Sequence, residues 1–275
     1  MNIFSIHAGR TDFLKPHVEY LRYYCKDEFN YFCVDNFVRE DQINFIKNQC
    51  EELGVNYLRP NFNRQGNAFD HGNCLNLLKN YTTDDVINII YEFDVFLTNQ
   101  FSFFDYIQDY DISGIYQQRK EFEIEYIAPF VIIVNKNSDF SSIDFNGFPG
   151  GDVGGGISKY IKGGKKVRWM KHTTGLTNHV DVNAFLEPYN INYGCQIIES
   201  SFLHYYKGTN WNGSNIKLVK EKTEWFFSLL EKSKTKEIFN RNYLEKYQTI
   251  FSQSFRHWNG SVKTFKSNLN PYYEN

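Results

Sequence analysis

Residues 86–97 read Val-Ile-Asn-Ile-Ile-Tyr-Glu-Phe-Asp-Val-Phe-Leu, an apolar segment interrupted by two acids. An apolar run of this length is typical of a strand that is buried on both faces of a parallel sheet. Because strand side chains alternate between faces, the pattern predicts that Glu92 and Asp94 point the same way. Two carboxylates at a buried strand end need neutralisation, for which a hard divalent cation is suited; the alternative is an exposed strand end with solvated acids.

The sequence before this segment alternates strand and helix patterns. We expect strands at 2–7, 30–36, 55–58 and 86–91, and helices at 16–25, at 40–53 and from 72 onward. Residues 40–53 are amphipathic, and Gly54 occupies the position of a C-cap. This order of strands and helices predicts an α/β fold with a mostly parallel central sheet and right-handed crossovers. Ligands of such sheets bind outside the carboxyl ends of the strands. Ala8, Arg10, Asp35 and the pair Glu92 and Asp94 follow strand ends and are therefore expected to converge there.

The second half of the chain is less regular. We expect strands at 112–119, 126–134 and 194–199, and a helix at 157–161 that follows the glycine-rich segment 147–156. Residues 218–257 have a helical composition with an apolar face. The expected organisation is a single catalytic domain over residues 1–215 with a helical C-terminal extension, residues 216–275, packed on it.

Composition restricts the class of protein. The chain has 275 residues, 41% of them hydrophobic, which is enough for a sizeable core, and its formal net charge of -2 argues against a nucleic-acid-binding surface. It has no apolar run long enough to span a membrane and no secretory leader, so we expect no membrane span. The five cysteines form no C-x-x-C pair, which favours reduced thiols and a cytoplasmic location.

Four segments occur in an order typical of one enzyme family. They are Val34-Asp35-Asn36, then Asp70-His71-Gly72-Asn73-Cys74-Leu75-Asn76, then Glu92-Phe93-Asp94, and finally His204-Tyr205-Tyr206-Lys207-Gly208-Thr209-Asn210-Trp211. Over roughly residues 1–211 the chain resembles nucleotide-sugar-dependent glycosyltransferases of the GT-A fold, which is Rossmann-like. Glu92 stands where the family's D-x-D motif has its first Asp, which makes Asp94 the stronger ligand candidate.

The resemblance implies a metal site and a nucleotide site. Glu92, Asp94 and His204 would bind the cation, for which we expect Mn²⁺, because manganese tolerates carboxylate and imidazole ligands together, or else Mg²⁺. The donor would be a nucleoside diphosphate sugar, with a UDP-sugar favoured, and the acceptor a hydroxyl group of a glycan or protein. The expected nucleotide-binding residues are Ala8, Arg10, Asp35, His71, Lys207 and Trp211.

Asp152 is the candidate catalytic base. It lies in the glycine-rich segment, where a loop can close over a ligand and a carboxylate can either bind acceptor hydroxyls or accept the acceptor proton in an inverting reaction. The alternative is a surface turn in which Asp152 caps the following helix. Glu123 and Asp144 are weaker candidates, and a retaining enzyme needs no dedicated base. Residues 117–119 are expected either to line the sugar site or to form a solvated strand end.

Other classes remain open. A sugar nucleotidyltransferase shares the α/β plan but normally carries a glycine-rich basic loop after its first strand. Residues 8–11 contain too few glycines and basic residues to form such a loop. A metal-dependent hydrolase would cluster its ligands more densely. A catalytically degenerate, glycan-binding module of the same fold is the non-enzymatic alternative, which Glu92 keeps open.

Overall fold

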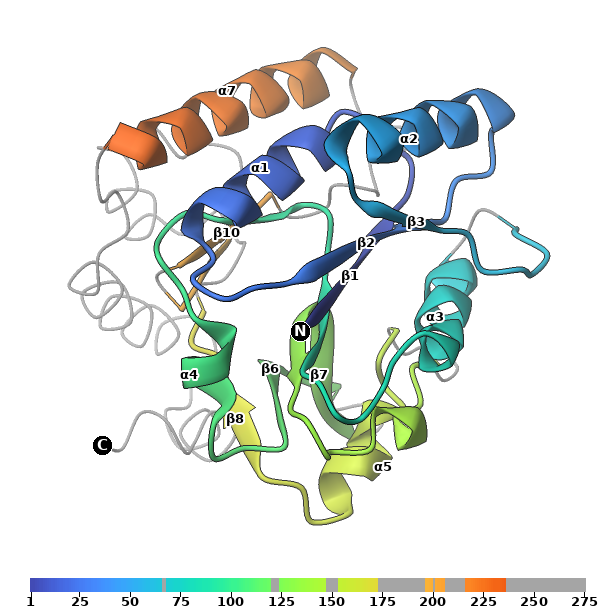
Figure 1. Ribbon diagram of the computed structural model, residues 1–275, viewed down its shortest axis with the longest axis vertical. Helices are drawn as coiled ribbons and strands as arrows, with labels where there is room; N and C mark the ends of the chain where they lie inside the picture. Colours follow the sequence, from blue (N-terminus) through green and yellow to red (C-terminus); the bar gives the residue numbers. More distant parts are fainter. Residues whose placement is uncertain are drawn as a thin grey trace. The chain divides into compact units, whose positions relative to one another are not determined.

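The computed structural model divides the chain into two compact units. Unit 1 comprises Met1–Phe96 and Gln100–Met170, and unit 2 comprises Leu97–Asn99 and Lys171–Asn275. The structure describes residues 1–65, 68–119, 124–146, 153–172, 196–199, 201–205 and 216–235. Figure 1 gives the element labels used below. The sequence-based division after residue 215 stays a prediction.

Unit 1 contains most of the described strands and helices. Its strands are β1 (Asn2–His7), β2 (Asn30–Asp35), β3 (Asn56–Leu58), β4 (Asn88–Tyr91), β6 (Ile112–Arg119), β7 (Ile124–Val134) and β8 (Val167–Trp169); β5 (Val95–Leu97) ends on the first residue of unit 2. Its helices are α1 (Leu14–Tyr24), α2 (Glu40–Leu53), α3 (Ala68–Leu77), α4 (Phe103–Ile107) and α5 (Ile157–Lys162), with 3-10 turns η1 (Leu78–Asn80) and η3 (Phe140–Ser142).

The expected strands and helices of unit 1 are present with small shifts of their ends, while α3 begins four residues before the expected start at 72. The short elements β5, β8 and α4 were not expected from the sequence. Gly54 ends α2 as its pattern predicted, with φ of 62° and its N–H bonded to carbonyls of the last turn.

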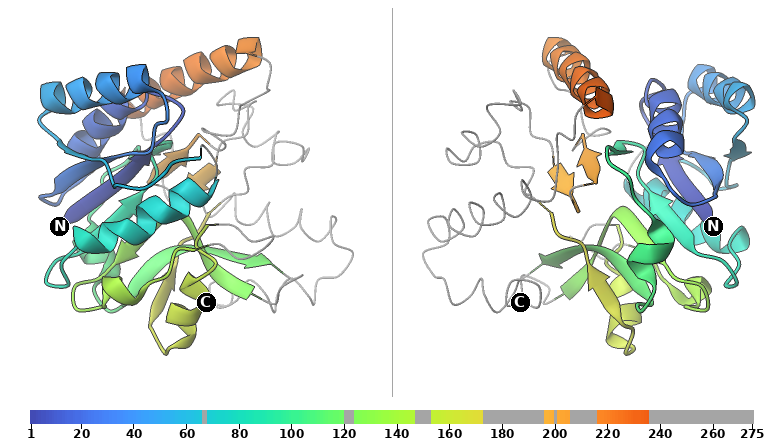
Figure 2. Two further views of the ribbon diagram at one scale, coloured as in Figure 1. Left: turned by 90° about the vertical axis from the view of Figure 1, so that its right-hand side faces the viewer. Right: turned by 60° about the vertical axis from the view of Figure 1, so that its left-hand side comes forward.

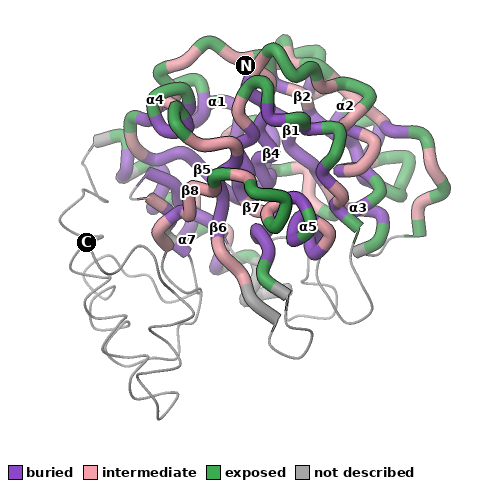
Figure 3. The backbone as a smooth tube through the Cα atoms, turned by 90° about the horizontal axis from the view of Figure 1, so that it is seen from below, coloured by how far each residue is buried: buried purple, intermediate pink, exposed green. Residues whose placement is uncertain are grey.

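The seven strands of unit 1 form one sheet in the order β3-β2-β1-β4-β7-β6-β8. Neighbours pair in parallel throughout β3-β2-β1-β4 and between β6 and β8, whereas β7 runs antiparallel to both β4 and β6. The prediction of an α/β fold with a mostly parallel central sheet is therefore confirmed. The central strand β4 is buried along its whole length (Figure 3).

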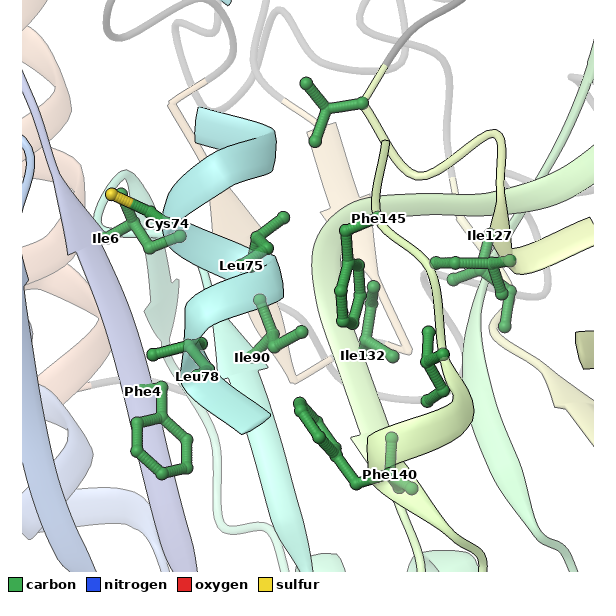
Figure 4. Packing of buried hydrophobic residues seen from close by; sticks show 14 of the residues in the cluster. Phe4, Ile6, Cys74, Leu75, Leu78, Ile90, Ile127, Ile132, Phe140 and Phe145 are labelled. Carbon is green, nitrogen blue, oxygen red and sulfur yellow. The ribbon is translucent and has the colours of Figure 1, made fainter. Parts of the chain in front are cut away.

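One face of the sheet packs against α3, η3 and α5. Figure 4 shows Cys74 of α3 beside Ile6 of the sheet, and Leu78 of α3 beside Phe4. Because side chains alternate along β1, Phe4 and Ile6 belong to this apolar face, while His7 belongs to the face that α1 covers (Figure 2). Packing on both faces of the sheet thus fixes the end of β4 that leads to Glu92 and Asp94.

The described part of unit 2 is small. Strands β9 (Gln196–Ile198) and β10 (Phe202–His204) pair antiparallel, and helix α7 (Ile216–Thr235) follows. Phe226 of α7 packs edge-on against Tyr205, with 5.1 Å between ring centroids. In the parts of the chain that the structure describes, no helix is long and apolar enough to cross a bilayer.

A buried polar cluster lies between β1, β2 and α1 in unit 1. The Tyr31 hydroxyl is 3.0 Å from His7 Nε2 and 2.8 Å from His17 Nδ1, and both imidazoles are almost completely buried. Burial lowers the pKa of His17 to about 3, although the negative charge of Asp94 opposes this shift. Burial likewise lowers the pKa of His7 well below its ordinary value. Both rings are therefore neutral at physiological pH.

This cluster predicts a pH-dependent stability. Between about pH 6.5 and about pH 3, His17 is protonated in the unfolded chain but stays neutral in the folded protein. The free energy of unfolding therefore falls as the pH falls through this range. His17 alone removes about 1.4 kcal/mol between about pH 7.5 and about pH 5.5. Urea unfolding at both pH values measures this loss, which His17→Leu reduces by that amount. An equal loss in the wild type and in His17→Leu would contradict the assignment.

Candidate active site

The carboxyl ends of β1, β2, β3 and β4 lie along one edge of the sheet, because these four strands are parallel. The register places His7 beside Asp35, and Val34 beside Leu58. Ala8, Asp35, Arg59 and Glu92 therefore occupy the first positions at or beyond this edge. The structure thus places these side chains of unit 1 in one region, as parallel-strand geometry requires.

Glu92 and Asp94 lie in a turn directly after β4, which corrects the expectation that strand alternation makes both side chains point the same way. β4 ends at Tyr91, Val95 N donates to Glu92 O at 3.1 Å, and Glu92 N donates to Phe130 O at 2.9 Å. The alternation of strand side chains consequently does not govern this pair. Glu92 is 8% exposed and Asp94 6% exposed, so two carboxylates are nonetheless held close in the chain with little access to water.

His71 contacts the first acid of the turn. It lies in the first turn of α3, within the helix rather than just before it, and its Nε2 is 2.8 Å from Glu92 Oε1. A protonated His71 would neutralise part of the buried negative charge. The structure therefore ties His71 to the acidic turn, and any contact of His71 with a donor nucleotide stays a prediction.

Asp35 is completely buried, accepts two hydrogen bonds and forms one ion pair. Phe37 N donates to it at 2.8 Å and the Tyr57 hydroxyl at 2.5 Å, and Arg59 Nη1 lies 2.7 Å from Oδ2. Burial, together with the hydrogen bond to Asp35 and its negative charge, raises the pKa of Tyr57, so its hydroxyl stays a donor. The Arg59 side chain is 30% exposed, and it is therefore the charged member of this group that a ligand can reach.

Arg10 contacts two side chains that follow it closely in the sequence. Its Nε donates to Asp12 Oδ1 at 3.0 Å, and its guanidinium lies 4.4 Å from the centre of the Phe13 ring. Gly9, with φ of 72°, makes the turn between Ala8 and Arg10. Ala8 and Arg10 thus lie where the sequence placed them, directly after β1, and their role toward a nucleotide stays a prediction.

Packing accounts for two glycines of the glycine-rich segment. A Cβ at Gly156 would lie 2.4 Å from Asp144 O, and one at Gly154, where φ is 98°, would lie 3.0 Å from Ile127 O. The N–H groups of Gly154 and Gly156 donate to Phe145 O and Asn146 O, at 3.2 Å each. These two glycines therefore dock the start of α5. Asp152 itself, with Glu123, lies outside the described residues.

His204 ends β10 in unit 2 and is 2% exposed. Its Nδ1 is 2.9 Å from Gln196 Oε1, and Gln196 Nε2 is 3.0 Å from His172 Nδ1. Lys207 and Trp211 lie outside the described residues. Within the described ranges, no three His, Cys, Asp or Glu side chains gather closely enough to hold a metal ion.

The donor set nevertheless suits a divalent cation. Glu92 and Asp94, both in unit 1, supply carboxylate oxygens, which are the ligands that hard divalent cations prefer. Burial of both acids makes a compensating positive charge favourable at the turn. The residues present therefore fit the expected cation chemically.

Several residues of these clusters were not singled out from the sequence. Arg59 could have been found, because it directly follows the expected strand 55–58, as Asp35 ends the strand before it. Tyr57, Gln196 and His172 had no such signal, since their partners come from other strands and depend on the pairing register. The contact between His71 and Glu92 likewise joins two elements separated in sequence.

Comparisons by sequence found neither a matching family model nor a matching curated protein. Comparison with solved structures found similar backbones. The mannosyltransferase PcManGT from Pyrobaculum calidifontis, in complex with GDP-Man and Mn²⁺, is 12% identical with a TM-score of 0.43, over 96% of this chain and 76% of that one. The galactosyltransferase LgtC with donor and acceptor sugar analogues is 11% identical with a TM-score of 0.37, over 59% and 66% of the two chains.

A nucleotidyltransferase is also among the similar structures. A glucose-1-phosphate thymidylyltransferase described as putative, from Bacillus anthracis and in complex with a sucrose, is 12% identical with a TM-score of 0.39, over 61% of this chain and 85% of that one. The present chain spans about two thirds of LgtC, or 61% of an active-site variant of it. The chain is thus similar in backbone to glycosyltransferases and to a nucleotidyltransferase.

Proposed function

We propose that the protein is a metal-dependent glycosyltransferase that moves a sugar from a nucleoside diphosphate sugar to a hydroxyl group of a glycan or protein. UDP-sugar is the donor that the sequence resemblance favours. The observation that carries the proposal is the turn with Glu92 and Asp94, two nearly buried carboxylates at the carboxyl edge of a parallel sheet. Sheets of this kind bind their ligands at that edge.

The proposed roles follow from the chemistry of the reaction. The leaving group is a nucleoside diphosphate, and a divalent cation bound by Glu92, Asp94 and His204 would stabilise its charge. Asp35 holds Arg59 and Tyr57 in place, and Arg59 offers its exposed edge to the nucleotide. We retain Arg10, Lys207 and Trp211 for the diphosphate, and Asp152 as the base that accepts the proton of the acceptor hydroxyl in an inverting reaction.

A non-catalytic glycan-binding module is the second candidate, and one contact favours it. His71 Nε2 lies 2.8 Å from Glu92 Oε1, so the first acid has a partner within the protein itself. A module of this kind would bind a glycan without requiring metal and nucleotide. The first experiment below distinguishes the two functions.

We predict metal-dependent nucleotide binding. In the presence of Mn²⁺, the protein should gain thermal stability with one of UDP, GDP, CDP and dTDP, and EDTA should abolish the gain. At a nucleotide concentration about 100 times Kd, the stabilisation is about 2.7 kcal/mol. A thermal-shift series with each nucleotide, with Mn²⁺ or EDTA, measures this and identifies the base of the donor.

Asp94→Asn tests the carboxylate within the same series. The variant keeps the shape of the side chain but loses its charge, so the Mn²⁺-dependent shift should disappear. The matched control is Asp109→Asn, at an exposed position of unit 1, which should behave as the wild type. Absence of a shift with every nucleotide in the wild type would overturn the transferase proposal and favour the glycan-binding module.

Arg59 should contribute to both stability and nucleotide affinity. Arg59→Gln removes the cation from the buried carboxylate of Asp35 and should lower the free energy of unfolding by about 2 kcal/mol. It should also weaken nucleotide binding about tenfold, since a charge-assisted hydrogen bond is lost. Urea unfolding and calorimetric titration measure the two effects. Arg39→Gln, at an exposed arginine paired with Asp41, should change neither quantity; unchanged nucleotide affinity in Arg59→Gln would refute the binding role.

A further inference from the structure

Gln196 connects two histidines in unit 2. It lies directly opposite His204 in the antiparallel pair of β9 and β10, and both side chains are buried. Its Oε1 is 2.9 Å from His204 Nδ1, and its Nε2 is 3.0 Å from His172 Nδ1. One amide thus bridges two imidazole rings.

The amide fixes where the imidazole protons are. An amide oxygen only accepts, so His204 Nδ1 must carry a proton, and in a neutral ring the lone pair is then on Nε2. The amide nitrogen only donates, so His172 Nδ1 must be unprotonated. Reversing the amide would require both rings to change tautomer. The orientation of the Gln196 amide and the tautomers of His172 and His204 are therefore coupled.

The backbone holds this arrangement in place. His172 forms an isolated antiparallel bridge with Ile198 of β9. Lys171 N donates to Glu199 Oε1 at 2.6 Å, and Glu199 N donates to Lys171 O at 2.8 Å. The segment that carries His172 is thereby pinned to the end of the strand that carries Gln196.

We propose that Gln196, which also contacts His172, is a positioning residue that keeps His204 in the tautomer with its lone pair on Nε2, the atom with which this ring would bind a divalent cation. This inference rests on the proposed role of His204 as a metal ligand. Metal-binding histidines need a hydrogen-bond acceptor at the other ring nitrogen, and loss of such a partner costs about 10- to 100-fold in metal affinity. Gln196 Oε1 is that acceptor.

The test combines the tautomer with metal affinity in the full chain. Nitrogen NMR of the protein labelled in its histidine rings, recorded without metal, should show His204 protonated at Nδ1. Mn²⁺ titration should then give a Kd that rises about 10- to 100-fold in Gln196→Leu and stays near the wild-type value in Gln196→Glu, whose carboxylate still accepts from Nδ1. Gln108→Leu, at an exposed position of unit 1, is the matched control and should bind Mn²⁺ as the wild type does.

The outcomes separate this inference from the proposed function. A wild type that has His204 protonated at Nδ1 but does not bind Mn²⁺ overturns the metal-dependent function. A His204 protonated at Nε2 in the wild type overturns the positioning role, and that measurement needs no variant to fold. A Kd for Mn²⁺ that is unchanged in folded Gln196→Leu also overturns the positioning role.

Discussion

The carboxylate of Asp35 has no exposure to water, and the arrangement of the sheet edge depends on how its charge is compensated. Parallel pairing brings the ends of β1, β2 and β3 together, so that Tyr57 and Arg59 from the third strand region reach the acid that ends the second. A buried carboxylate without such donors would cost several kcal/mol. The need to satisfy this one charge therefore constrains the geometry of the residues that follow β2 and β3.

Glu92 and Asp94 are also buried acids whose charges need nearby polar groups. Glu92 lies against His71, and the charge of Asp94 acts on the buried ring of His17. His17 and His7 share the Tyr31 hydroxyl on the α1 side of the sheet, so the acidic turn is backed by neutral polar groups and not by a wholly apolar core. A turn supported in this way can hold two carboxylates in place before any ligand arrives.

Local patterns predicted the parts of the molecule that local physics determines. Apolar runs gave β1, β2, β4 and β7, the amphipathic period gave α2, and Gly54 marked its end, because each signal lies within one element. The end of β4 at Tyr91 agrees with the expected strand 86–91, but the turn that carries Glu92 and Asp94 was not expected, and the hydrogen bond from Glu92 N to Phe130 O depends on a strand about forty residues later in the sequence. Gln196 could not be singled out, because its partners depend on strand register, whereas the position of Arg59 directly after the expected strand 55–58 was a usable signal.

The order of the strands also has a consequence for synthesis. The first four strands of the sheet are complete by Tyr91, but β4 receives its second neighbour only when β7, which ends at Val134, has been made. Until then a strand that is wholly buried in the finished protein presents an unpaired edge. The nascent chain thus passes through an interval in which its central strand is open to pairing with another chain, and aggregation during expression should originate there.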